Sequence, residues 1–144
     1  MIDPYVSGMV KNDPYAKKTT VVGRVVAVLR GKMDNRNLSL ITPWSRALKS
    51  GEIHELILTD EQSAAPGKNV NKIAYLAFVE IINPGVIVFR DKVKLSSGKC
   101  IGTLAGFDET HMPNHQNIVI ITDQLTTGEE MNLNINDLIY FTRD

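Results

Sequence analysis

The densest group of reactive side chains in this 144-residue chain is DETHMPNH at residues 108–115. It carries two imidazoles, His111 and His115, and two carboxylates, Asp108 and Glu109. Nitrogen and oxygen ligands of this kind suit a divalent metal such as zinc, which binds them tetrahedrally. A metal-dependent enzyme that uses His111 and His115 is therefore one hypothesis for the function.

A structural loop is the alternative interpretation of the same stretch. Pro113 disfavours a helix, on which the spacing of the two histidines would place both rings on one face. Asp and Asn side chains commonly bind nearby backbone groups in turns, and Asp108, Asn114 and Asn117 are candidates for this role. On this interpretation the loop is structural or binds a partner, there is no cofactor, and no residue is assigned as catalytic.

An internal similarity favours the structural interpretation. Residues 23–42 align with residues 102–122 with one gap, and a second pair of similar blocks follows in the same order. Such collinear similarity predicts a duplicated supersecondary unit. Both copies keep a methionine and two asparagines in the loop, whereas the first copy has Lys32 and Arg36 in place of the histidines. The shared methionine and asparagines are therefore interpreted as structural residues. The histidines, which only the second copy has, are the candidates for a function of that copy.

Short β-strands are predicted throughout both copies. Four segments either alternate between apolar and polar residues or are continuously apolar, as strands do. They are Thr19–Arg30, Asn37–Ile41, Lys99–Asp108 and Asn117–Ile121. The second pair of similar blocks is SGEIHELILTD at residues 50–60 and TGEEMNLNIND at residues 127–137. In residues 127–137, alternation predicts a further strand from which Met131, Leu133 and Ile135 point inward.

One short helix is expected near residues 43–50. Thr42 is a suitable N-cap, Pro43 fits the first turn, and Gly51 can end the helix. Otherwise the many short strands and turn residues predict an all-β fold. We expect an internally duplicated small barrel, either SH3- or Sm-like or one interleaved barrel with pseudo-two-fold symmetry.

The predicted domain organisation is one compact unit over residues 1–144. It would contain two structural repeats, one over about 19–82 and one over about 84–142. Copies of about 70 residues bury little apolar surface on their own, so a shared core is favoured.

Part of the second copy resembles a known family. VKLSSGKCIGTLAGFD at 93–108, followed by NIVI at 117–120, resembles the first motif of the Sm-like small β-barrels, and NINDLIYF at 134–141 resembles their closing strands. The resemblance thus extends over residues 93–141. In that family, the loop between the Asp and the Asn binds single-stranded RNA by base stacking and side-chain hydrogen bonds. The resemblance implies an RNA-binding loop formed here by Asp108, His111, Met112, Asn114, His115 and Asn117.

Two features of the chain depart from that family. The loop is longer and contains Pro113, and Asn136-Asp137 stands where the family has Arg-Gly. The arginine that binds RNA in the family therefore has no counterpart here.

The bulk composition gives no general attraction to nucleic acid or membranes. Lys and Arg number 16, as do Asp and Glu, so the formal net charge at pH 7 is zero. No secretory signal opens the sequence, and no apolar run reaches the roughly 18 residues of a membrane span. The lone Cys100 has no internal disulfide partner. A cytoplasmic protein with no membrane partner is expected.

The leading hypothesis is a non-enzymatic cytoplasmic β-barrel that binds a ligand of unknown identity or assembles with itself. Residues 1–37 are predominantly basic and residues 108–144 predominantly acidic, which could orient contacts between subunits. Edge strands also favour pairing with a second copy. We therefore expect a homo-oligomer, with RNA binding and metal-dependent catalysis as the alternatives.

Overall fold

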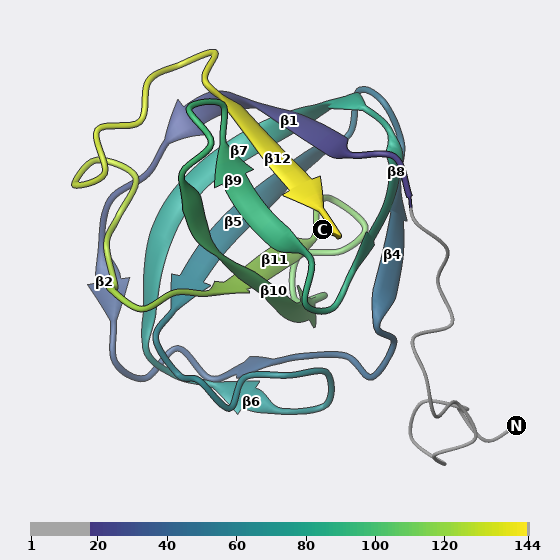
Figure 1. The fold of residues 1–144 in the computed structure, drawn as a ribbon. Helices are drawn as coiled ribbons and strands as arrows, with labels where there is room; N and C mark the ends of the chain where they lie inside the picture. The colour runs from purple at the N-terminus through teal and green to yellow at the C-terminus, as the bar shows by residue number, and fades with distance from the viewer. Residues whose placement is uncertain (1–17, 144) are drawn as a thin grey trace, which may run out of the picture.

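The computed structural model describes residues 18–143, which form an all-β fold without a helix and thus without a membrane-spanning helix (Figure 1). Seven strands make a closed ring in the order β1-β12-β9-β10-β11-β5-β7, and β7 pairs back with β1. Their bounds are β1 Val21–Val28, β5 Ile53–Thr59, β7 Ile73–Asn83, β9 Lys92–Leu95, β10 Cys100–Asp108, β11 Asn117–Ile121 and β12 Leu138–Thr142. Within the ring only β11 and β5 are parallel.

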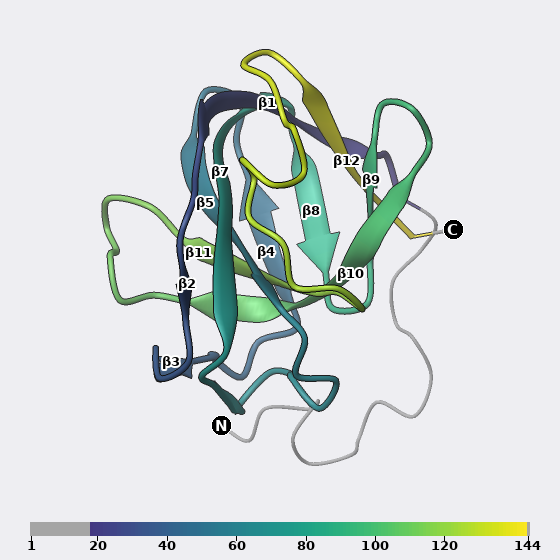
Figure 2. The ribbon, with the colours of Figure 1, turned by 90° about the vertical axis from the view of Figure 1, so that its left-hand side faces the viewer.

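Five shorter strands complete the described structure. β2 (Lys32–Met33) pairs with the start of β7, and β3 (Leu38–Ser39) pairs with β6 (Asn69–Val70). β4 (Ser45–Leu48) pairs with β8 (Gly85–Val88). Figure 2 shows the ring from the side, with the loop that follows β10 projecting away from it.

The main core draws on strands from both halves of the sequence. Its largest fully buried side chains include Leu56 of β5, Leu104 and Phe107 of β10, and Phe141 of β12. A smaller cluster lies under β3 and β6 and covers the other face of β5, β10 and β11. These three strands are therefore buried on both faces, which explains their nearly continuous apolar sequences.

The duplication is not shown by the structure. β10 and β11 form an antiparallel hairpin, whereas β1 pairs with β7 and β12, and β3 pairs with β6. The second pair of similar blocks also differs in structure. Residues 50–60 contain strand β5, whereas residues 127–137 form turns. Similar residues in the two segments thus occupy different positions in the sheet.

The helix expected near residues 43–50 is wrong, because Ser45–Leu48 form strand β4. Pairing with β8 and packing outweigh the local capping signals: Leu48 is buried, and the Trp44 ring meets Phe89 edge-on at 5.2 Å. The Gly51 backbone is left-handed, as expected of a helix end, but here it sits in the turn between β4 and β5.

The strand expected around Met131–Ile135 is also wrong, because a capping box starts a turn there. Thr127 Oγ1 accepts a hydrogen bond from Glu130 N at 3.1 Å, and Glu130 Oε1 accepts one from Thr127 N at 2.9 Å. Met131 N then donates to Thr127 O at 2.9 Å. We call residues 127–133 the capping turn. Its Leu133 is buried, but Ile135 is 54% exposed rather than inward.

Two glycines are required by close backbone contacts. A Cβ on Gly128 would lie 1.9 Å from Leu76 O, and one on Gly102 would lie 2.1 Å from Ile121 O. We predict that Gly128→Ala and Gly102→Ala each lower the free energy of unfolding by about 3 kcal/mol or more, because backbone atoms would have to move. Chemical denaturation would measure the loss.

Gly98→Ala is the matched control. Gly98 has a positive φ of 94°, but no atom lies within 4 Å of the position that a Cβ would take, so this change costs only backbone strain, about 1–2 kcal/mol. If Gly128→Ala were no more destabilising than Gly98→Ala, the docking of the capping turn against β7 would be wrong.

Candidate functional site

The Asp108 carboxylate, at the end of β10, ties three segments together. Oδ2 accepts a hydrogen bond from Ser39 N at 3.0 Å, while Oδ1 accepts from Thr110 N at 2.9 Å and from Asn117 Nδ2 at 3.1 Å. Burial alone would raise the pKa of Asp108, but these hydrogen bonds hold it below its usual range. The oxygens of Asp108 thus face its own loop and β3, which is the arrangement of a structural residue.

The two asparagines of the loop have different surroundings. Asn117 is completely buried and donates to Asp108, whereas Asn114 is exposed and lies in the loop turn. Their counterparts in the earlier sequence segment do not repeat these contacts. Asn37, for example, has a left-handed backbone and donates its N–H to Asn71 Oδ1 at 3.1 Å.

His54 of β5 is a buried, neutral histidine. Its Nδ1 accepts a hydrogen bond from Gln116 N at 3.0 Å, so the ring proton is on Nε2, which lies 3.1 Å from Glu52 Oε1. Burial lowers the pKa of His54, and the Glu52 carboxylate only partly offsets this effect. The ring therefore fastens the end of the loop to β5.

The rings of His115 and His111 lie next to each other beside β5, tilted by 32°. Their ring centroids are 5.1 Å apart, and the His115 ring also meets Phe78 edge-on at 5.3 Å. His115 Nε2 lies 3.6 Å from Oε1 of the buried Glu55. Burial raises the pKa of Glu55 above its usual range, against the opposing effect of the two histidines.

The predicted metal ligands do not converge. Asp108 is committed to the hydrogen bonds above, and Glu109 Oε2 accepts one from Gln116 Nε2 at 2.7 Å. Among residues 18–143, no three His, Cys, Asp or Glu side chains are placed to hold a metal ion. His111, Met112 and Asn114 are exposed on the projecting loop (Figure 2). RNA binding by this loop stays a prediction.

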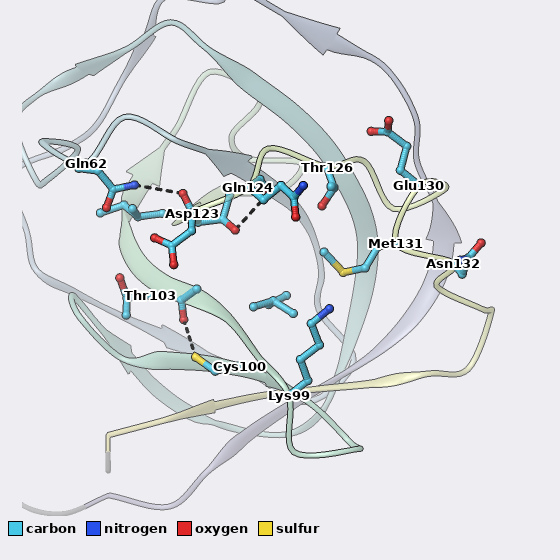
Figure 3. A pocket seen from close by; sticks show the side chains of 14 residues that line it. Gln62, Lys99, Cys100, Thr103, Asp123, Gln124, Thr126, Glu130, Met131 and Asn132 are labelled. Atoms are coloured by element: carbon cyan, nitrogen blue, oxygen red, sulfur yellow. Dashed lines mark hydrogen bonds between the residues drawn. The ribbon is translucent and has the colours of Figure 1, made fainter.

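A pocket lies elsewhere in the described structure, and we call it the Cys100 pocket (Figure 3). Its volume is about 790 Å³. It lies between the start of β10, the segment that follows β11, and the capping turn. Its lining residues are Gln62, Lys99, Cys100, Ile101, Gly102, Thr103, Ile121, Thr122, Asp123, Gln124, Thr126, Glu130, Met131 and Asn132.

The pocket combines apolar surface with polar groups of both charge signs. Ile101, Ile121 and Met131 contribute the apolar part. Lys99 contributes an ammonium group and Asp123 a carboxylate. Figure 3 shows the Lys99 side chain reaching toward Met131, with Asp123 at the other side of the space. Amides and hydroxyls from Gln62, Gln124, Asn132, Thr103 and Thr126 complete the lining.

Hydrogen bonds and an ion pair fix the segments that form the walls of the pocket. Gln62 Nε2 donates to Thr122 O at 3.1 Å, which joins the loop after β5 to the segment after β11 (Figure 3). Glu130 of the capping turn also forms an ion pair with Lys32 of β2, whose Nζ lies 3.1 Å from Glu130 Oε1. The Glu130 pKa is lowered by its hydrogen bond from Thr127 N and by Lys32. Glu130 therefore has partners outside the pocket, which leaves Lys99 and Asp123 as its principal charges.

Sequence reasoning missed this pocket. Its residues come from four separated segments, and their types match no binding motif. One usable signal existed: Thr127 followed three residues later by Glu130 is a capping-box spacing, which would have placed a turn where alternation predicted a strand.

The first prediction from this geometry concerns the asparagines. We expect Asn117→Ala to lower the free energy of unfolding by about 1–3 kcal/mol, because it removes a donor to the buried Asp108 carboxylate. Asn114→Ala and His111→Ala change exposed side chains and should have effects within about 0.5 kcal/mol. If urea denaturation showed that Asn114→Ala and Asn117→Ala lower the free energy of unfolding equally, the structural role of Asn117 would be contradicted.

The second prediction concerns pH. The folded-state pKa of Asp108 is below its unfolded value of about 3.9, so the ionised carboxylate stabilises the fold above about pH 4. This stabilisation is lost as pH falls through the folded pKa. The free energy of unfolding of Asp108→Asn should therefore be about 1–3 kcal/mol lower than that of the unsubstituted protein at neutral pH. This difference in unfolding free energy should narrow below about pH 4. Asp34→Asn, on an exposed turn, is the control; a gap at Asp108 that does not change with pH would refute the assignment.

Comparison with known proteins gives a family but no described activity. No curated protein and no solved structure matches the chain significantly. The strands that carry the resemblance to Sm-like barrels, β9 to β12, are adjacent in the ring. Residues 15–142, nearly the whole chain, match a family of unknown function. The chain therefore belongs to the family of unknown function DUF6917.

Proposed function

We propose that this protein is a non-enzymatic binding protein that holds a small polar molecule in the Cys100 pocket. The observation that carries the proposal is the pocket itself. Its volume of about 790 Å³ lies within the range of small-molecule sites, and it joins an apolar lining to a few polar groups.

The charges of the pocket indicate the kind of ligand. Lys99 suits a carboxylate or another anionic group, and Asp123 suits an ammonium group or hydroxyls. Because the two charges belong to different segments, one ligand with groups of both kinds could contact both. A zwitterionic or hydroxyl-rich molecule with a small apolar part matches this lining.

Binding is favoured over catalysis by the positions of the titratable groups. None of the three histidines lines the pocket. His54 and His115 are held beside Gln116 and Glu55 at the other end of β11. Of the pocket carboxylates, Glu130 is occupied by Thr127 and Lys32.

The single cysteine provides a direct test, because thiol alkylation reports on this pocket alone. Amino acids, polyols and sugars would be screened by thermal denaturation, since a ligand of the folded state raises the melting temperature. We expect at least one stabilising compound, and we expect it to slow alkylation of Cys100 by iodoacetamide in proportion to occupancy.

Charge variants separate the pocket from other surfaces. Lys99→Gln or Asp123→Asn should weaken binding of that compound about tenfold, as expected for the loss of a charge-assisted hydrogen bond. Lys72→Gln changes an exposed lysine elsewhere and should leave binding unchanged. A stabilising compound that neither protects Cys100 nor responds to these variants would refute the proposal.

A further inference from the structure

The outer face of β1, β12 and β9 presents a row of side chains away from the core. On β12, Ile139 and Phe141 are buried, so Tyr140 points outward; on β9, Val93 is buried and Lys94 points outward. The strand register places Tyr140 opposite Lys94 on one side and Val22 on the other. Directly opposed side chains on one face of a sheet are in contact range. β12 lies at the front of Figure 1, between β9 and β1.

A shallow hollow of about 570 Å³ covers this row. Around Tyr140 and Lys94, its rim carries the hydroxyls of Thr19, Thr20 and Ser96. Asn83 also borders it, and its Nδ2 donates to Thr20 O at 2.6 Å. The hollow therefore offers an aromatic ring, a cation and several neutral hydrogen-bonding groups.

The charge of this face is positive. Strands β1, β9 and β12 contain no Asp or Glu, and none of the residues lining the hollow is acidic. The nearby Asp91 is completely buried, with Lys18 Nζ at 2.9 Å and Arg143 at 3.6 Å. Among the described residues, neither Lys94 nor its neighbour Lys92 forms an ion pair. Such a surface attracts anions.

We propose that this face binds a nucleotide unit, with its base stacked on Tyr140 and its phosphate at Lys94. Stacking on an aromatic side chain beside a basic group is how proteins hold nucleotides of a single strand without base-edge readout. The hydroxyls along the rim suit the sugar. This site shares no lining residue with the Cys100 pocket, and the two proposals stand independently.

The probes are AMP, adenosine, inorganic phosphate and a short oligoadenylate, each titrated into the full chain by calorimetry. We expect AMP to bind more tightly than adenosine or phosphate, because only AMP engages both Tyr140 and Lys94. An oligoadenylate that binds more tightly than AMP and weakens with salt would identify a single strand as the source of the nucleotide. AMP binding at least as tightly as the oligonucleotide would identify a free nucleotide; either result supports the site.

Four variants decide whether the binding is at this face. Lys94→Gln and Tyr140→Leu should each weaken AMP about tenfold, through loss of the charge and of the stacking ring. Tyr140→Phe keeps the ring and should bind within about twofold of the unsubstituted protein, while Lys72→Gln is the charge control. Circular dichroism would check that each variant is folded. No binding of AMP or oligoadenylate, or binding that Lys94→Gln and Tyr140→Leu leave unchanged, would overturn the proposal.

Discussion

β1 makes backbone hydrogen bonds along both of its edges, to β7 on one side and to β12 on the other. Because a strand edge left open in water invites pairing with other chains, this double pairing removes two edges at once. It also fixes where the C-terminal part of the chain must go. From the end of β11, the chain has to cross the ring to reach β12 beside β1, and it does so through residues 122–137.

That crossing segment creates the Cys100 pocket. It is attached to the ring by backbone bonds, including Gly128 N to Tyr75 O at 3.1 Å and Glu129 N to Leu29 O at 3.0 Å. The approach is so close that only glycine fits at position 128. The segment therefore forms a wall of the pocket opposite the start of β10, and Lys99, Asp123 and Met131 are among the residues that line the pocket (Figure 3). In this way the closure of the sheet leads to the pocket.

The same closure separates two surfaces of different chemistry. Strands β1, β12 and β9 contain no carboxylates, and the nearby Asp91 is buried against two cations. The Cys100 pocket instead contains both charge signs. The net charge of zero thus hides local differences, because the sum over a sequence does not record which residues share a face.

Residue patterns predicted the strands better than they predicted their partners. Alternation located β1 and β10, and the apolar run located β11. The signals that failed were local ones. Thr42, Pro43 and Gly51 fit a helix, yet pairing with β8 decided the structure of the segment between them.

The candidate sites show the same limit. The hydrogen bonds of Asp108 and Asn117 follow from turn chemistry that a sequence can suggest. The Cys100 pocket joins Gln62 with residues 99–103, 121–124, 126 and 130–132, and only the strand order brings these together. Periodicity says which face a residue occupies, and it does not say which distant segment faces it.

The proposed pocket requires a capping turn that is fixed to the ring before any ligand binds. Amide hydrogen exchange measures this directly, because amides bonded within a stable sheet exchange only on large-scale opening. The amides of Gly128, Glu129 and Leu29 should exchange about as slowly as those of the core strands β5 and β7. Exchange of Gly128 and Glu129 as fast as that of the exposed residues 109–114 would contradict a preformed pocket wall, and with it the proposed binding site.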